Sequence, residues 1–282
     1  MSAHVASSSH RWLSTQTWFG RAFVTFAAML VLMSAAKASQ SWPGIQAEVY
    51  AGKTLHDGRG VLTLKAPYRP DDVRSVPLEA DAKFTDGRTI KSVTFIVDEN
   101  PSPVAAAFRL AGSRPSVHLL THIRLDQQSD VRVVVEASDG TLYMVEQLVK
   151  FAGGQASCSA PPMGDPAEIL ASTGKMDFAQ VGDKVKSSHS LQRARLALSH
   201  PNHTGMVLDQ ITLLYVPMLM VNHIEARQGD ELVFDMTGSI TMAQNPVVEF
   251  DYVTNGADEM TTVAKDTSGA AWQKRFPIGP AS

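Results

Sequence analysis

The sequence has little cysteine: Cys158 stands alone in 282 residues. One cysteine cannot form an internal disulfide, so its thiol must stay free, be modified or pair with another chain. Charge is also scarce, because charged residues make up 19% of the chain and the formal net charge is -3. This balance gives no electrostatic reason to expect nucleic acid or an anionic membrane surface as a partner.

Long apolar runs are absent after the first forty residues. Before that point Arg11 and Arg21 precede an uncharged apolar run at residues 22–35, and Ala36-Lys37-Ala38 follows. This is the layout of a cleaved secretory signal, so we expect residues 1–38 to be removed and the mature protein to be periplasmic. A membrane anchor is the alternative, but the run is shorter than the roughly 20 residues that span a bilayer. No membrane partner is expected after cleavage.

Catalytic signatures are missing as well. No Ser-His-Asp order, phosphate-binding glycine loop or pair of carboxylates stands out from the background. We therefore expect no catalytic residue, no cofactor and no enzymatic activity.

Histidines in the second half leave a metal site as an alternative. His200 and His203 stand three apart, with His189 and His223 elsewhere. Structural zinc needs four nitrogen or sulfur ligands, and this half contains no cysteine. A turn built on the neighbouring proline and glycine is favoured, and no metal is expected.

Methionines in the same half raise the possibility of copper. Met218 and Met220 are two apart in a methionine-bearing stretch, 206–220, and thioethers are copper ligands. Alternating methionines on a strand more often fill a core, and that interpretation is favoured. A copper- or zinc-binding periplasmic protein remains the third functional hypothesis.

Short alternating segments, separated by turn residues, predict β-structure throughout the remaining chain. The run 90–97 is dense in β-branched residues, and Asp139-Gly140 predicts a hairpin turn. Many short strands at this spacing are typical of β-sandwiches. We expect one sandwich at residues 43–152 and a second at 183–280. The predicted strands are 62–66, 73–78, 90–97, 104–110, 117–125, 131–137, 141–151, 191–198, 221–226, 231–236, 247–253 and 260–263.

Residues 153–182 break this pattern and predict a linker between the sandwiches. Small residues and prolines surround Cys158, and Gly153 and Gly154 precede it. Such a composition favours a flexible, exposed and mobile arm, in which the two glycines supply flexibility and other proteins can reach the thiol. A short helix is expected to begin with Asp165 as its N-cap.

Several motifs of the first half occur in the order found in a known family. They are Asp98-Glu99-Asn100-Pro101-Ser102-Pro103, Thr121-His122-Ile123-Arg124-Leu125, Asp139-Gly140, and Val149-Lys150-Phe151-Ala152-Gly153-Gly154 followed by a cysteine. With them, the first half resembles SoxY, the sulfur-carrier subunit of the thiosulfate-oxidising complex.

The second half carries its own set of motifs. They are His200-Pro201-Asn202-His203-Thr204-Gly205, Asn245-Pro246 with Phe250, and Asp266 with Gly269. This half resembles SoxZ, the partner subunit. Together the halves are similar to fused SoxYZ-like carriers associated with quinoprotein dehydrogenases.

The resemblance implies two immunoglobulin-like sandwich domains that pair with each other, and a cysteine that carries sulfur intermediates for periplasmic sulfur-oxidising enzymes. That cysteine would be Cys158. The sequence departs from the family because Gln155-Ala156-Ser157 separate Cys158 from the glycines, and because a second domain follows the arm. An accessory or binding module for a periplasmic quinoprotein (PQQ-dependent) dehydrogenase, independent of the thiol, is the alternative function.

Overall fold

The structure, a computed structural model, describes residues 40–278 except 113, 152, 154 and 183–188. The expected signal peptide at 1–38, the glycine Gly154 and the predicted domain ends at 152, 183 and 280 lie outside the described residues. Among the residues that are described, no helix has both the length and the apolarity to cross a membrane.

Strands form in the first half because apolar residues alternate with polar ones or occur in β-branched runs. In β3 (Val76–Lys83) every second side chain is buried, whereas β4 (Ile90–Val97) and β7 (Ser129–Ala137) are buried over most of their length. The other strands of this half are β1 (Leu55–Asp57), β2 (Leu62–Lys65), β5 (Val104–Leu110), β6 (Ser116–Ile123) and β8 (Leu142–Val149).

The second half repeats this pattern of short alternating strands. In β10 (Leu191–Leu198) and β14 (Glu259–Asp266) the buried and more exposed positions alternate along the strand. The remaining strands are β9 (Met176–Val181), β11 (Val221–Gln228), β12 (Glu231–Gly238), β13 (Val247–Val253) and β15 (Ala271–Pro277).

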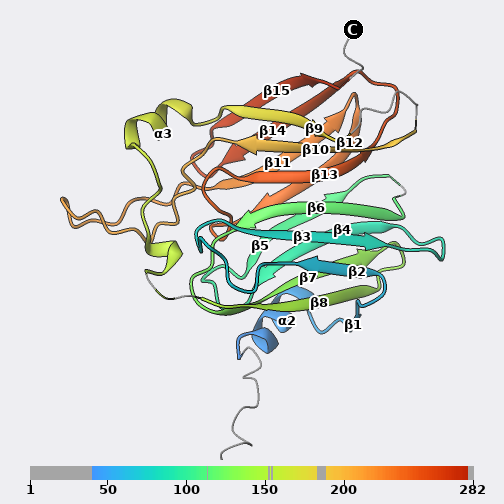
Figure 1. Ribbon diagram of the computed structural model, residues 1–282, viewed down its shortest axis with the longest axis horizontal. Coiled ribbons are helices and arrows are strands. Elements are labelled where there is room, and N and C mark those ends of the chain that lie inside the picture. Colours follow the sequence, from blue (N-terminus) through green and yellow to red (C-terminus); the bar gives the residue numbers. More distant parts are fainter. Residues whose placement is uncertain (1–39, 113, 152, 154, 183–188, 279–282) are drawn as a thin grey trace, which may run out of the picture. The chain divides into compact units, whose positions relative to one another are not determined.

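The two halves share both of their sheets. The first sheet has the order β1-β8-β7-β4-β5-β12-β11-β14-β15, and the second has the order β2-β3-β6-β13-β10-β9. Two antiparallel pairs join the halves, β5 with β12 and β6 with β13. We call these two pairs the domain junction. The sandwich therefore runs without a break from one half into the other, as the neighbouring green and orange strands show (Figure 1).

A row of aromatic side chains crosses the domain junction inside the sandwich. Phe108 on β5 meets Phe95 at 5.9 Å and Phe234 at 5.6 Å between ring centroids, both edge to face. Phe234 in turn meets Phe250 at 4.9 Å. All four rings are buried, so edge-to-face packing and apolar burial stabilise the pairing of the two halves.

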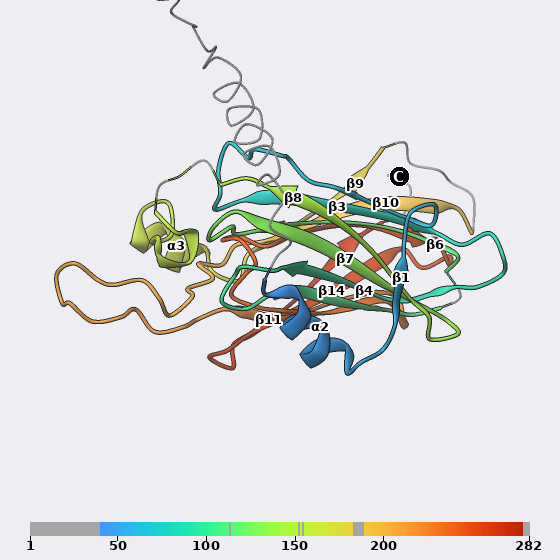
Figure 2. The ribbon, with the colours of Figure 1, turned by 90° about the horizontal axis from the view of Figure 1, so that it is seen from below.

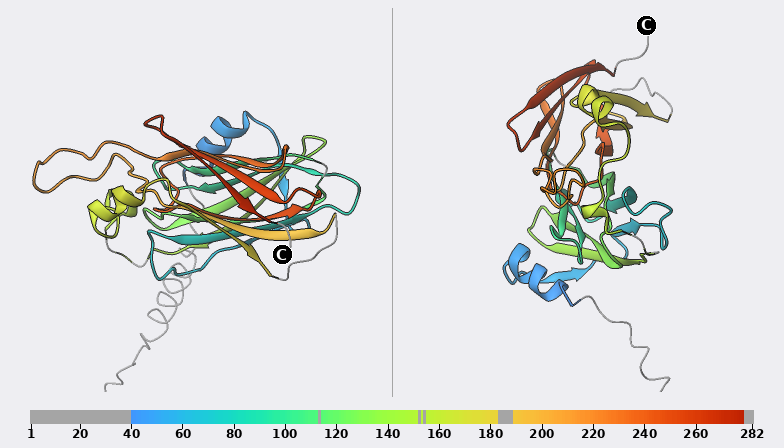
Figure 3. Two further views of the ribbon diagram at one scale, coloured as in Figure 1. Left: turned by 90° about the horizontal axis from the view of Figure 1, so that it is seen from above. Right: turned by 90° about the vertical axis from the view of Figure 1, so that its left-hand side faces the viewer.

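Three short helical elements accompany the sheets: α2 (Trp42–Tyr50), the 3₁₀ turn η1 (Ser157–Ser159) and α3 (Pro166–Ser172). α2 packs Ile45 and Tyr50 into a small apolar cluster with side chains of the first sheet. α3 begins at the predicted cap, because an Asp165 carboxylate oxygen accepts from the backbone N–H groups of Ala167 and Glu168. Together with the loop 199–220, α3 lies at one end of the sheets (Figure 2 and the left panel of Figure 3).

The all-β prediction of two immunoglobulin-like sandwich domains is confirmed. Five elements were not predicted: α2, β1, η1, β9 and β15. β9 falls within the predicted linker, and β3 begins and ends later than the predicted strand 73–78. Edge strands such as β1, β9 and β15 have one paired neighbour, so their formation depends on that neighbour more than on their own residue pattern. The flexibility expected of 153–182 stays a prediction.

Candidate functional site

Cys158 lies in η1, and its side chain is fully buried. The prediction that this cysteine is exposed is therefore wrong, whereas the mobility of the arm stays a prediction. Its backbone N–H donates to Asp126 Oδ1 at 2.8 Å, and its carbonyl oxygen accepts a hydrogen bond from Thr204 Oγ1. The neighbouring Ser157 Oγ donates to the Leu125 carbonyl at 2.8 Å. Small residues let the segment pack closely, and hydrogen bonds from both halves of the chain hold it there.

The surroundings of the Cys158 thiol keep it protonated. Burial, helped by the nearby negative charge of Asp126, raises its pKa to about 12. Arg124 and a hydrogen bond from Ser157 act in the opposite direction but do not outweigh these effects. The thiolate is the nucleophilic form, so the thiol is unreactive in this position at neutral pH.

Asn100, from the motif Asp98 to Pro103, positions the chain next to Cys158. Its Nδ2 donates to the Arg124 carbonyl at 2.8 Å, and its Oδ1 accepts from the Asp126 N–H at 3.0 Å. Asn100 thereby fixes the backbone on both sides of Leu125, which is also the backbone that Ser157 contacts. This motif residue is therefore part of the support of the cysteine.

Arg124 has its guanidinium buried beside Cys158. Its Nη1 donates to the carbonyl oxygens of Asn202 at 2.7 Å and Ile240 at 3.1 Å. No carboxylate forms an ion pair with it among the residues that the structure describes, and burial lowers its pKa from the ordinary arginine value. This side chain connects the first half to the second through backbone acceptors, without cancelling its charge.

Asn202, at the centre of the His200-to-Gly205 motif, is fully buried with a φ of 50°. Its Nδ2 donates to the Met242 carbonyl at 2.8 Å, and its Oδ1 accepts from the Val221 N–H at 2.9 Å. Asparagine tolerates this left-handed conformation better than most residues. The side chain joins three separate stretches of the second half, which explains why the motif needs this residue type.

His200 is buried and uses both ring nitrogens within the protein. Its Nδ1 accepts from the Asn202 N–H at 3.0 Å, and its Nε2 lies 3.4 Å from Asp266 Oδ2. The Asn245 side chain accepts from the His200 N–H at 3.0 Å. The motif residues of the second half thus form one hydrogen-bonded network. This arrangement matches the structural role favoured by the sequence, because neither nitrogen of His200 is left for a metal.

Two groups of side chains in the described part of the chain bring three potential metal ligands within 4.8 Å. They are Glu79, Asp81 and His118, and His223, Glu225 and Asp235. Cationic side chains already occupy both groups, since Lys65 Nζ lies 2.6 Å from Glu79 Oε1 and Arg227 Nε lies 2.6 Å from Glu225 Oε1. Of the histidines considered from the sequence, His223 alone belongs to either group.

The loop between β10 and β11 bears large apolar side chains that face solvent. Ile211 is 92% exposed, and Leu213, Leu214 and Tyr215 are also exposed. Met218 is 50% exposed, so the expectation that its stretch fills a core is wrong. The loop is held to itself by isolated bridges near its base and its tip, and not by a regular sheet.

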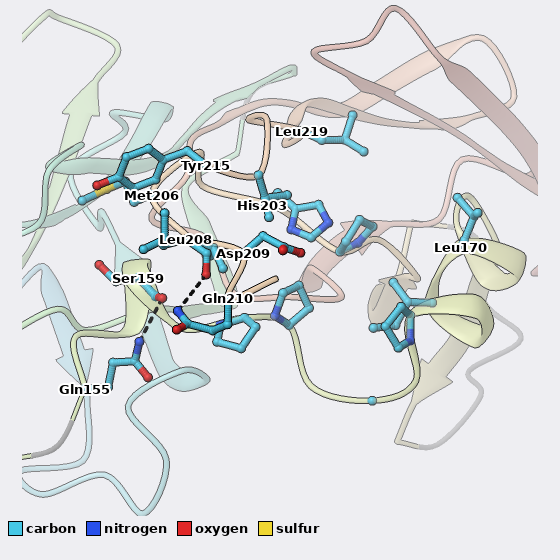
Figure 4. A pocket seen from close by; sticks show the side chains of 18 of the residues that line it. Gln155, Ser159, Leu170, His203, Met206, Leu208, Asp209, Gln210, Tyr215 and Leu219 are labelled. Carbon is cyan, nitrogen blue, oxygen red and sulfur yellow. Dashed lines mark hydrogen bonds between the residues drawn. The ribbon is translucent and has the colours of Figure 1, made fainter. Parts of the chain in front are cut away.

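A cavity of about 970 Å³ separates this loop from α3 and the residues before it. Ser159 and Leu170 line it from one side, and His203, Met206 and Tyr215 line it from the other (Figure 4). The Gln155 side chain donates to the Ser159 carbonyl at 3.0 Å at its edge. The cavity therefore begins one residue beyond Cys158. Sequence reasoning missed it because its walls come from two distant segments.

Gly153 is the described one of the two arm glycines. Its φ of 96° lies in the region that glycine adopts without strain. This explains a glycine where the chain leaves β8, but it gives no measure of flexibility. The role of Gly153 as a flexible position stays a prediction.

Comparison with known proteins gives two family matches along the chain. The sequence model of sulfur oxidation protein SoxY matches residues 46–155, and that of sulphur oxidation protein SoxZ matches residues 182–277. No curated protein matches the sequence significantly.

Two solved structures are similar in part. The sulfur carrier protein SoxY from Chlorobium limicola f thiosulfatophilum is 21% identical, with 40% of this chain and 97% of that chain covered and a TM-score of 0.32. A beta-glycosidase from Bacteroides vulgatus is 8% identical, with 77% of this chain and 24% of that chain covered and a TM-score of 0.22. Both TM-scores are low, so neither structural likeness carries an argument about function.

Proposed function

Because this chain is a fusion of a SoxY domain and a SoxZ domain, we propose that it carries sulfur intermediates covalently on Cys158 for partner enzymes. The observation that supports this role most directly is the position of the cysteine. It is the single cysteine of the chain, and the segment that holds it, residues 155–163, is bound by side chains from both domains. We call this stretch the Cys158 segment.

The proposed carrier alternates between a retracted and a released thiol. In the retracted state described above, burial and Asp126 keep the thiol protonated. Once the Cys158 segment leaves its site, the thiol regains an ordinary pKa. Its thiolate can then attack the sulfur of an S–S bond on a partner enzyme, so that a new S–S bond forms on Cys158 as the old one breaks and the thiolate of the partner leaves. Oxidation and hydrolysis of the carried group would be performed by those enzymes, and the carrier itself would have no catalytic residue.

We place this cycle in the periplasm, on the basis of the expected signal peptide at 1–38. Thiosulfate is the substrate class suggested by the family resemblance. An oxidising compartment suits a carrier with one cysteine, because no second thiol in the chain can trap the first as an internal disulfide.

Intact mass spectrometry of protein purified from its native periplasm without reductant tests the carrier role. We expect sulfur-containing adducts that a thiol reductant removes and that a Cys158→Ser variant lacks. A single unmodified mass from cells grown on several sulfur and alcohol sources would contradict covalent carriage.

A second function, as an accessory module for a periplasmic quinoprotein dehydrogenase, is favoured by one observation. Cys158 is inaccessible and its pKa is raised, which suits a residue that only fills space. Growth of a Cys158→Ser strain distinguishes the two functions. Loss of sulfur-dependent growth supports carriage, whereas an unchanged phenotype on all substrates supports the accessory role.

A further inference from the structure

A second cavity, of about 330 Å³, lies against the second sheet on the other side of the Cys158 segment. Its walls include the side chains of Arg74, His122, Arg124 and Arg195, and Ser157 and Pro161 close it from the Cys158 segment. No aspartate or glutamate is among its lining residues. We call it the cationic pocket.

Two of its arginines lack an acidic partner. Arg124 is 5% exposed and donates to backbone carbonyls alone. Arg195, on β10, is exposed and forms no ion pair or hydrogen bond with the described residues. Arg74 is paired with Asp72 at 2.9 Å, at the exposed edge of the pocket. The positive charge of the pocket is therefore only partly balanced by the protein.

His122 adds a polar group without a partner. Its Nδ1 is buried and has no hydrogen bond. Burial lowers the pKa of His122, and the positive charge of Arg195 lowers it further. The imidazole is therefore neutral mainly because it is buried, and the charge of Arg195 adds to this effect.

Gathering guanidinium groups in a partly enclosed space costs electrostatic free energy, unless an anion compensates them. Guanidinium groups match the oxygens of tetrahedral oxyanions through paired, charge-assisted hydrogen bonds. The cationic pocket, at about 330 Å³, has more space than one such ion fills, because even a single water occupies only about 30 Å³ in the liquid. An oxyanion could therefore bind together with several waters.

We propose that the cationic pocket binds a small dianionic oxyanion of the sulfate type, and that the bound ion keeps the Cys158 segment retracted. The coupling between the ion and the segment follows from the residues that line the pocket. Ser157 and Pro161 belong to the Cys158 segment, so movement of this segment away from its site opens the pocket and releases the ion. This coupling rests on the proposed function of Cys158, whereas the anion site itself does not.

Isothermal titration calorimetry of the purified protein with sodium sulfate and sodium thiosulfate, at ionic strength held constant with sodium chloride, tests the site. We expect saturable binding that Arg195→Gln weakens by about tenfold or more, the loss of one charge-assisted hydrogen bond. Arg275→Gln is the matched control, because Arg275 is an exposed arginine on the edge strand β15. His122→Gln provides a second variant, and circular dichroism verifies that each variant is folded.

The coupling is tested by the rate at which a small alkylating reagent labels Cys158. Sulfate should slow labelling of the wild-type protein and have no effect on Arg195→Gln. Cys158→Ser should bind sulfate as the wild type does, which separates the anion site from the carrier role. Absence of saturable binding, or equal binding by wild type, Arg195→Gln and His122→Gln, would overturn the site. Binding without any change in labelling would overturn the coupling.

Discussion

The Thr204 hydroxyl, in the second domain, donates a hydrogen bond to the carbonyl oxygen of Cys158, which lies between the two domains. The same hydroxyl accepts from the Met206 N–H at 3.1 Å. On the opposite side, Asp126 of the first domain accepts from the Cys158 N–H. The cysteine is therefore held by both domains at once, and its release requires both contacts to break.

Replacing Thr204 by Val should make Cys158 easier to reach. The change keeps the side-chain shape but removes a buried hydrogen bond worth roughly 1–2 kcal/mol. Opening of the Cys158 segment should therefore become roughly five to thirty times more frequent, as measured by the rate of thiol labelling under native conditions. Thr212→Val, at the exposed tip of the loop 199–220, is the control. Equal labelling rates for Thr204→Val and wild type would show that Thr204 does not hold the segment.

The stability of the protein should fall at alkaline pH because of Cys158. Its pKa is about 12 in the folded state and near 9 when unfolded, so the unfolded chain loses its thiol proton first as the pH rises. Between about pH 9 and pH 12 this group alone should lower the free energy of unfolding by about 1.4 kcal/mol per pH unit. Urea unfolding of wild type and Cys158→Ala across this range measures the free energy of unfolding of each protein. In the difference between the two, the contributions of the other titrating groups cancel. Parallel pH profiles for the two proteins would contradict the raised pKa.

Asn202→Ala should strongly destabilise the protein. It leaves the Met242 carbonyl and the Val221 N–H buried without their partners, and it places alanine at a φ of 50°. We expect a loss of about 3 kcal/mol in the free energy of unfolding, measured by urea denaturation. Asn255→Ala, at an exposed turn, should cost less than about 1 kcal/mol. A similar, small cost for both substitutions would show that the network around Asn202 is not a major source of stability.

Gly174→Ala should be destabilising for a steric reason. An added Cβ would lie 2.0 Å from Trp272 Nε1, and the φ of 85° also disfavours alanine. Gly256 has a similar φ of 92° but open space around it, so Gly256→Ala measures the backbone cost alone, about 1–2 kcal/mol. We expect the melting temperature of Gly174→Ala to fall well below that of Gly256→Ala. If the two variants have the same melting temperature, Trp272 moves aside without a cost in stability.

The strands rich in β-branched residues, such as β4 and β13, could be predicted from the sequence alone, because such residues favour the extended backbone of a strand. The helix α3 could be predicted for the same local reason, since Asp165 and Pro166 form a helix start on their own. β1, β9 and β15 were not predicted, because each is an edge strand whose formation depends on its one paired neighbour more than on its own residue pattern.

For the candidate site, the sequence by itself determined which residue can carry a covalent group, because Cys158 is the only thiol. It also determined the motifs that surround it, since Asn100, Arg124 and Asn202 stand in recognisable patterns. Only the tertiary structure decided that Cys158 is buried and protonated, and that Arg74, His122, Arg124 and Arg195 share one pocket. Burial and the gathering of charge depend on strand pairs that bring segments from far apart in the chain together, and no local pattern specifies which segments will meet.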